Sequence, residues 1–314
     1  MRRALLLGLS FAAAGPAGAA PQDLPGPPRF ATGVDAVYVD VFVTHRGAPV
    51  PGLTSRDFEV EDEGTRREVV LVERESVPLT VVLVFDTSSS VQGEKLLALR
   101  AAGNALLDAL PPAARVAFLG FNHDIELLAP LGPDRDAVRR GLAAMSPGGS
   151  SAVFDALFAG LGLAGHTPSL VLLFSDGEDN LSWLGADDVR ASTERANALV
   201  HVIGFVPPLP SRLGSSDPAL AEWKQPRHVR ELRRIAEATG GRFWSAESPA
   251  RIREAFAAVA AEVDARYLLR FEPKGTARPG WHRLDVRLKR SRGTVRARRG
   301  YYVAPGPHDP GVPP

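Results

Sequence analysis

The sequence predicts an α/β protein in which a doubly wound, mostly parallel sheet is inserted into a β-sandwich formed by the two flanking segments. Apolar runs of strand length alternate with amphipathic helical patterns over residues 78–263, which is typical of repeated βα units. Residues 30–76 and 265–303 instead show short alternating patterns that indicate half-buried strands. Neither flank has enough strands for a stable sheet of its own, so we expect the flanks to pair.

The flanks are expected to consist of short strands. Val37, Val39, Val41 and Val43 fall on one face of an extended chain, which is the period-two signal of a strand. A turn-forming stretch follows at residues 46–52, where glycine and proline are frequent. Further strands are expected at residues 58–60, 69–72, 267–271, 284–288 and 294–303.

The central segment is expected to alternate between buried strands and helices. Gly240 and Gly241 end one helical pattern, and Ser248 followed by Pro249 supplies a cap and a first-turn proline for the last helix. Right-handed crossovers between the strands would place helices on both faces of the sheet. Strands are expected at residues 79–85, 115–121, 169–175, 199–206 and 242–245, and helices around 96–110, 153–164, 229–236 and 249–263.

Composition limits the classes of function. The chain has 314 residues, of which 45% are hydrophobic, so it can bury a substantial core. Its formal net charge of +1 gives no bulk attraction for nucleic acid or for an acidic partner. It has no cysteine, which excludes disulfides and thiolate chemistry.

The N-terminal residues 1–20 are predicted to be a signal peptide. Arg2 and Arg3 precede an apolar stretch at residues 4–14, and small residues at 17–19 suit cleavage. We therefore expect export to the periplasm or the outside of the cell. No later run is long and apolar enough for a transmembrane segment, and the tail at 304–314 is predicted to be disordered.

The most informative stretch joins an apolar run at residues 81–85 to Asp86, Ser88 and Ser90. The run reads as a strand buried on both faces, and ligands of open α/β sheets bind at the carboxyl ends of such strands. Three oxygens at this spacing can turn toward one hard divalent cation. The alternative is a plain polar loop that caps the next helix.

Two later segments favour the metal site over the plain loop. Ser150 and Ser151 follow two glycines and open a helical pattern, and Asp176 ends the next buried strand. Carboxylates at the ends of neighbouring strands would repel each other and be costly to desolvate. A divalent cation between Asp86 and Asp176 would remove that cost.

Together these segments resemble the von Willebrand factor type A (vWA) domain, over residues 78–263. Its metal-ion-dependent adhesion site uses Asp-x-Ser-x-Ser, a Thr from a second loop and an Asp from a third. Asp86, Ser88 and Ser90 match the first motif, and Asp176 matches the last. Ser151, or alternatively Ser150, stands where the family has Thr; the missing methyl leaves the side-chain rotamer less restrained. The flanks are similar to an exported bacterial family of vWA-related proteins.

The resemblance implies a Rossmann-like fold and a metal-dependent protein-binding function without enzyme activity. Mg²⁺ is favoured because it keeps bound waters and needs few carboxylates, with Mn²⁺ and Ca²⁺ as alternatives. A partner protein would supply an Asp or Glu carboxylate to the cation. The loop at residues 206–226, which contains five prolines, is expected to shape the partner surface together with Trp183 and Trp223. The alternative is that this loop is a disordered insert remote from the functional site.

Two rival functions remain open from the sequence. A hydrolase is one, but no serine lies in a Gly-x-Ser-x-Gly elbow, and His123 and His201 are read as structural or solvated. The other is a binder of anionic envelope polymers, because basic residues gather near the C-terminus; export makes nucleic acid an unsuitable ligand. These residues are Arg283, Arg287, Lys289, Arg290, Arg292, Arg296, Arg298 and Arg299.

Overall fold

The structure, a computed structural model, describes residues 36–72, 77–165, 169–176, 179–196, 198–205, 226–273, 278–289 and 293–303. The chain divides into two compact units, residues 1–32 and 33–314, and every described residue belongs to the second. The expected signal peptide, the loop at 206–225 and the tail at 304–314 lie outside the described residues.

The central sheet of the described chain has six strands in the order β11-β10-β9-β6-β7-β8. Neighbouring strands are parallel except for β8, which pairs with β7 in the antiparallel sense. Its strands are β6 (Thr80–Asp86), β7 (Arg115–Phe121), β8 (Ile125–Gly132), β9 (Ser169–Ser175), β10 (Ala198–Phe205) and β11 (Phe243–Ala246).

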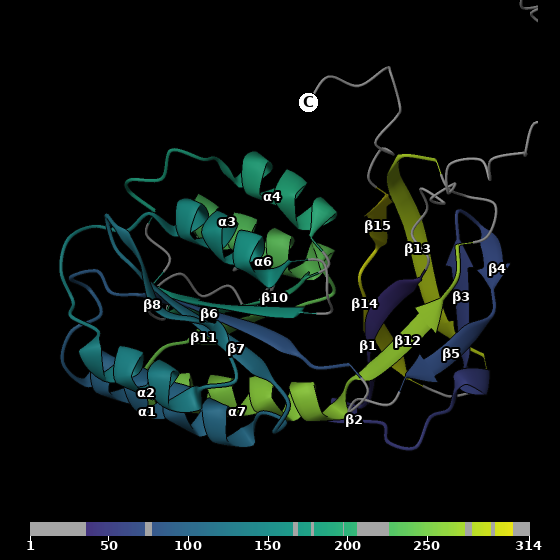
Figure 1. The fold of residues 1–314 in the computed structure, drawn as a ribbon, viewed down its shortest axis with the longest axis horizontal. Helices are drawn as coiled ribbons and strands as arrows, with labels where there is room; N and C mark the ends of the chain where they lie inside the picture. The colour runs from purple at the N-terminus through teal and green to yellow at the C-terminus, as the bar shows by residue number, and fades with distance from the viewer. Residues whose placement is uncertain are drawn as a thin grey trace, which may run out of the picture. The chain divides into compact units, whose positions relative to one another are not determined.

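Helices cover both faces of this sheet (Figure 1). One face carries α1, α2 and α7, and the other carries α3, α4 and α6. None of the described helices is long and apolar enough to cross a membrane. The helices are α1 (Glu94–Ala109), α2 (Arg135–Ala144), α3 (Val153–Ala164), α4 (Ala186–Arg195), α6 (Arg227–Ala238) and α7 (Pro249–Ala265).

The two central strands explain the uninterrupted apolar runs of the sequence. Every residue of β6 and β9 is buried, because helices pack against both faces of the sheet. Phe85 on β6 makes edge-on ring contacts with Phe118, Phe174 and Phe256 at centroid distances of 5.2, 6.4 and 5.5 Å. Apolar burial therefore fixes the strand that ends at Asp86.

The two flanks pair with each other in two antiparallel sheets. One described sheet has the order β14-β1-β12-β5, with β2 paired to β1, and the other has the order β15-β13-β3-β4. Their inner faces share one apolar core, in which the alternating valines of β1 meet Phe58 and Phe271. The strands are β1 (Val37–His45), β2 (Ala48–Pro49), β3 (Phe58–Asp62), β4 (Thr65–Arg67), β5 (Val69–Val72), β12 (Tyr267–Phe271), β13 (Gly280–Leu288), β14 (Thr294–Ala297) and β15 (Gly300–Val303).

The single strand expected at residues 294–303 is wrong: the structure has two strands in different sheets. β14 pairs with β1, whereas β15 pairs with β13. The chain crosses between the sheets at Arg298 and Arg299, and Arg298 donates from Nε to the carbonyl of Gly300 at 2.5 Å. A side chain at position 300 would collide with Trp281 and with the backbone of His282, so glycine permits the crossing.

Three elements of the central segment were not expected. They are β8, α2 and α4; β8 and α4 contribute little to the core, whereas α2 buries Val138 and Leu142. β8 lies at the edge of the sheet and has mostly exposed or partly exposed residues. α4 buries only Val189 and Thr193 among its ten residues, so its apolar pattern is too sparse to predict a helix.

The C-terminal flank is joined to the α/β layer by close backbone packing. Arg296 on β14 donates hydrogen bonds to the Gly240 carbonyl at 2.6 Å and to Glu262 of α7 at 2.5 Å. Gly240 has φ +81°, and a Cβ there would lie 2.6 Å from backbone atoms of Ala297 and Arg298. The glycine is needed for both the left-handed conformation and the close approach.

A buried histidine lies next to this junction. His201 on β10 accepts a hydrogen bond from the Arg242 N–H at Nδ1, at 3.1 Å, and its Nε2 is 3.4 Å from a carboxylate oxygen of Glu262. Burial, together with the positive charges of Arg296 and Arg242, holds the pKa of His201 well below its ordinary value. The imidazole is therefore neutral in the folded protein at neutral pH.

Substituting Gly240 should destabilise the protein more than substituting Gly64, which also has a positive φ (+75°) but has open space around its Cβ position. We expect Gly64→Ala to lower the free energy of unfolding by about 1 kcal/mol through the unfavourable φ alone. Gly240→Ala adds a clash and should cost about 3 kcal/mol. Urea denaturation of both variants measures this difference, and equal losses would contradict the close packing described here.

The depressed pKa of His201 predicts acid sensitivity. Below about pH 6.5 the unfolded chain protonates this residue while the folded protein does not. The unfolding constant should therefore rise as the pH falls, by at most about tenfold per pH unit from this group. In His201→Asn, which keeps an acceptor for the Arg242 N–H, this contribution should disappear from urea titrations at pH 5 to 7.

The matched control is His45→Asn, which changes an exposed histidine and leaves His201 in place. It should keep the acid dependence. If His201→Asn has the same pH dependence as the unmodified protein, the neutral buried state of His201 is wrong.

Candidate metal site

The candidate site begins at the carboxyl end of β6. Phe85 pairs with Phe174 in the parallel register of β6 and β9, so Asp86 and Ser175 come at the same edge of the sheet. Asp86 is fully buried, and Ser175 donates a hydrogen bond from Oγ to its Oδ2 at 3.0 Å. Sequence reasoning did not select Ser175, although it directly precedes Asp176 at the end of a buried strand.

The loop after β6 folds its hydroxyls back toward Asp86. The Ser88 N–H donates to Asp86 Oδ1 at 2.8 Å, and the hydroxyls of Ser88 and Ser90 lie 2.8 Å apart. Thr87, the residue between the ligand positions, donates from its own N–H and Oγ1 to the Phe121 carbonyl at 2.6 and 3.0 Å. The last residue of β7 therefore holds the loop after β6 in place through Thr87, and leaves Ser88 and Ser90 free to turn toward Asp86.

The second loop brings Ser151 into the same site. Its Oγ lies 3.2 Å from Oδ2 and 3.4 Å from Oδ1 of Asp86, and the residue is 3% exposed. Ser150 is exposed, so of the two serines that the sequence left open, Ser151 is the one in contact with Asp86. Backbone hydrogen bonds from Ser89 N–H to the Gly149 carbonyl and from Gly148 N–H to the Thr87 carbonyl join the two loops.

The third candidate ligand, Asp176, follows β9. Its Oδ1 is buried and has no hydrogen-bond partner among the described residues. Burial, the largest cause, and the negative charge of Asp176 raise the pKa of Asp86, while hydrogen bonds from Ser88 and Ser175 lower it; together they bring the pKa to about 6. The buried carboxylate of Asp86 and the partly exposed carboxylate of Asp176 thus repel each other.

This site has two carboxylates and several hydroxyls, which is an unusual donor set. Within the described ranges, no three His, Cys, Asp or Glu side chains are grouped so that they could share a metal ion. Ser88, Ser90 and Ser151 supply neutral oxygens instead. A cation bound to such a set keeps part of its positive charge, and hard oxygen donors suit Mg²⁺ or Ca²⁺.

Helix α3, which follows Ser151, is capped by side chains from the loop after Asp176. Its own N-cap residue, Ala152, has no side-chain acceptor. Asp179 Oδ1 accepts from the Val153 N–H at 2.9 Å, and Ser182 Oγ accepts from the N–H groups of Phe154 and Asp155 at 3.0 and 3.2 Å. These contacts satisfy the free N–H groups of the first turn.

The same loop is bound to α3 in the reverse direction. Asp155 accepts hydrogen bonds from the N–H groups of Trp183 and Leu184 at 3.0 and 2.9 Å. The Ser151 carbonyl accepts from the N–H groups of Asn180 and Leu181 at 3.0 and 3.2 Å. The loops that carry Ser151 and Asp176 are therefore connected by hydrogen bonds in both directions, so their ligand atoms are positioned together.

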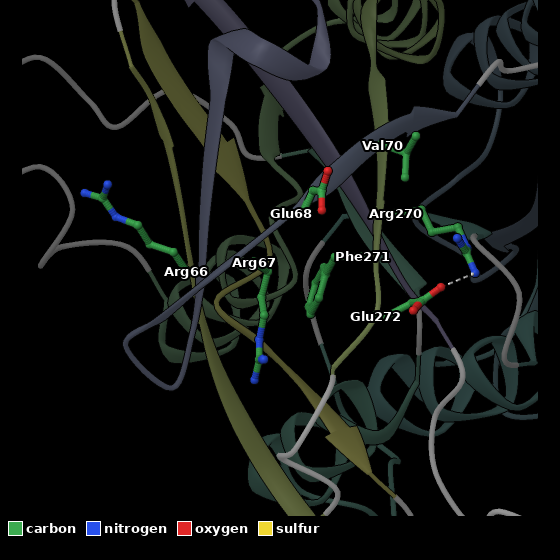
Figure 2. A pocket seen from close by; sticks show the side chains of 7 residues that line it. All are labelled: Arg66, Arg67, Glu68, Val70, Arg270, Phe271 and Glu272. Carbon is green, nitrogen blue, oxygen red and sulfur yellow. Dashed lines mark ion pairs between the residues drawn. The ribbon is translucent and has the colours of Figure 1, made fainter.

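A second candidate region is the charged surface of the flanking sheets, where Figure 2 shows a shallow hollow beside β4, β5 and β12. Its cationic side chains have acidic neighbours. Arg66 pairs with Glu59 at 2.8 Å, and Arg270 pairs with Glu272 at 3.5 Å. The hollow is lined by Arg66, Arg67, Glu68, Val70, Arg270, Phe271 and Glu272.

The basic residues near the C-terminus do not form one surface in the described chain. Arg298 is largely buried, which lowers its pKa to about 10, and Arg296 binds Glu262 at the junction with α7. Arg287 is bonded to Asp285 at 2.6 Å and pairs in register with Glu59 on β3. The exposed face of β13 thus carries mixed charge. Arg290 and Arg292 lie outside the described residues.

Comparison with known proteins identifies the fold around this site. A family profile described as the von Willebrand factor type A domain matches residues 81–178, from β6 to just beyond Asp176. Residues 81–178 thus belong to a vWA-type domain. Its Asp86, Ser88, Ser90, Ser151 and Asp176 all lie within the matched residues.

Individual relatives are distant. The "UPF0353 protein" of Mycolicibacterium paratuberculosis is 25% identical over 204 residues, which span 58% of this chain and 60% of that protein. The solved structure of a von Willebrand factor type A protein from Catenulispora acidiphila has a TM-score of 0.50 and 16% identity, and covers 81% of this chain and 74% of its own. At this identity the likeness is one of fold.

A bacterial pilus protein has a similar but weaker match. The vWF domain of the type V pili tip protein Mfa5 from Porphyromonas gingivalis has a TM-score of 0.46 and 14% identity. The match covers 60% of this chain and 95% of that domain.

The reciprocal hydrogen bonds predict that Asp179 supports the site without being a ligand. Asp179→Ala removes the oxygen that accepts hydrogen bonds from the Val153 N–H and the Ser182 hydroxyl. This substitution should lower the free energy of unfolding by about 1 kcal/mol. Asp179→Asn keeps an oxygen acceptor and should lose much less. Denaturant titration of the two variants decides the matter: equal stability of both would contradict the capping role.

Proposed function

We propose that this vWA domain is a metal-dependent protein-binding module, in which Asp86, Ser88, Ser90, Ser151 and Asp176 bind a divalent cation. The observation that carries the proposal is the buried Oδ1 of Asp176, which has no hydrogen-bond partner in the described chain and faces the charge of Asp86. A buried carboxylate oxygen without a donor is costly unless a cation compensates it.

The donor set favours Mg²⁺. Mg²⁺ binds through one or two carboxylates and keeps several waters, whereas Ca²⁺ usually takes more oxygen ligands from the protein. Two carboxylates and three serine hydroxyls match the first requirement. Mn²⁺ and Ca²⁺ are the alternatives that a titration has to compare.

A cation held mainly by neutral hydroxyls remains electrophilic toward an incoming ligand. We infer that an Asp or Glu side chain of a partner protein completes its coordination by replacing a water. The chain's own residues would position the cation: Asp86 and Asp176 supply charge, and Ser151 and Ser88 supply oxygens already turned toward Asp86. The function is binding, so no residue is assigned a catalytic role.

Neither rival function has support from a specific contact. In the described structure the hydroxyls of Ser88, Ser90 and Ser151 are hydrogen-bonded to one another or to Asp86, and none is bonded to a histidine that could act as a base. The mixed charge of β13 argues against a polyanion surface. We also propose that the protein is exported, for which the basic and apolar pattern of residues 1–20 is the support.

Calorimetric titration with Mg²⁺, Mn²⁺ and Ca²⁺ tests the site directly. The unmodified protein should bind Mg²⁺ with one site, and Asp86→Ala should bind none. Ser151→Ala should lower the Mg²⁺ affinity at least about tenfold, because removing even a group that only hydrogen-bonds to a metal ligand costs that much. Ser150→Ala is the matched control and should bind as the unmodified protein does.

A second measurement guards against misfolding of the variants. Ligand binding to the folded state raises the unfolding temperature, so Mg²⁺ should stabilise the unmodified protein and Ser150→Ala but not Asp86→Ala. If millimolar Mg²⁺ and Mn²⁺ neither release heat nor raise the unfolding temperature, the proposed metal site is wrong.

A further inference from the structure

The loop that connects Asp176 to α4 presents a bare aromatic side chain next to the candidate metal site. Trp183 is 96% exposed, and Leu181 is 47% exposed. Scattered exposed apolar residues are ordinary on protein surfaces, but a fully exposed tryptophan is not. Large apolar side chains gathered at one place mark surfaces that bind other molecules.

Trp183 is exposed although the backbone of its loop is held by several hydrogen bonds. Backbone N–H groups on both sides of the tryptophan are engaged: those of Asn180 and Leu181 donate to the Ser151 carbonyl, and those of Trp183 and Leu184 donate to Asp155. The backbone is thus fixed while the indole stays in water. A rigid aromatic side chain loses little entropy when a partner covers it.

The apolar side chains also lie close to the metal ligands. Ser151 faces the site with its hydroxyl, 3.2 Å from Asp86, while its carbonyl binds the Leu181 N–H. Phe158, which is 45% exposed, lies one turn after Asp155 on the same side of α3.

The charge around the site selects the kind of partner. Lys95 at the start of α1 has its ammonium 4.2 Å from the ring centre of Phe205, the last residue of β10. The carboxyl ends of parallel strands share one edge of the sheet, so this positive charge is at the same edge as Asp86. A bound cation and Lys95 would favour an anionic ligand, whereas Asp187 and Asp188 in the first turn of α4 add negative charge on the Trp183 side.

We propose that the site takes an extended segment of a partner protein in which a carboxylate is followed or preceded, within a few residues, by an aromatic or large aliphatic side chain. The carboxylate binds the cation, and the apolar side chain packs on Trp183 and Leu181. This inference rests on the proposed metal-dependent binding. A second copy of the chain is a poorer occupant, because three side chains fall short of the roughly 800 Å² that each partner buries in a stable interface.

A displayed peptide library with a fixed central Asp between randomised residues tests the proposal, using the full chain with Mg²⁺ and elution by a chelator. Selection should enrich an aromatic or large aliphatic residue at a constant offset from the Asp. The same selection on Trp183→Ser should still yield peptides that the chelator releases, but without the apolar preference. Val70→Ser is the control, since it removes a 53% exposed apolar side chain from β5 of the flanking sheets.

Peptides selected on the unmodified protein should bind Trp183→Ser at least about tenfold more weakly, as expected for an aromatic anchor, and should bind Val70→Ser unchanged. Mg²⁺ affinity should be equal in all three proteins. Chelator-sensitive binding without an apolar preference, or with the same preference in Trp183→Ser, would overturn the proposal and leave the metal site standing. Absence of any chelator-sensitive binding would overturn both this proposal and the metal-dependent binding on which it rests. Dimerisation that depends on Trp183, measured by sedimentation, would show that a second copy of the chain, and not a partner segment, occupies the surface.

Discussion

The site is organised around the placement of two carboxylates at the ends of adjacent parallel strands. β6 and β9 are buried on both faces, so their positions are fixed by apolar packing and not by the charges that they carry. Packing therefore places the fully buried Asp86 near the negative charge of Asp176; burial is the main cause of the raised pKa of Asp86, and the charge of Asp176 adds to it. The hydroxyls and N–H groups around Asp86 reduce this cost only in part. The loops of the site lower the free-energy cost of placing two carboxylates close together, because their hydroxyl and N–H groups donate hydrogen bonds to Asp86.

The loops achieve this by binding one another. α3 starts at a residue that cannot cap it, and the missing acceptors come from Asp179 and Ser182. The loop that supplies the acceptors is in turn fixed by Asp155 of the helix. Such reciprocal bonds order two loops at once, so the entropy cost of ordering each is shared. The same arrangement connects the ligand positions to the exposed Trp183.

Much of the fold could be predicted from the sequence, because the buried strands and amphipathic helices have strong periodic signals. The cap at Ser248, whose hydroxyl accepts from the Arg251 N–H, was also readable. The weaker elements were not: β8 lies at an edge, and α4 buries two residues. The break at Arg298 was hidden because strands β14 and β15 are continuous in pattern and differ only in their partners.

For the site, the sequence supplied the oxygen-bearing residues but not their contacts. It favoured Ser151 but left Ser150 as an alternative, since only the three-dimensional course of the loop turns one inward and the other outward. It missed Ser175, whose role depends on the register between β6 and β9. The capping of α3 by Asp179 could not be read either, because the contact joins residues 26 positions apart.

Both margins of the central sheet are unsuited to accepting another strand. β11, at one margin, has four residues, and β8, at the other, contains Pro130 and an irregular register with β7. Proline offers no N–H to a neighbouring strand, and short or irregular borders discourage intermolecular sheet growth. Self-association through strand addition is thereby disfavoured at both edges of the sheet formed by the described strands.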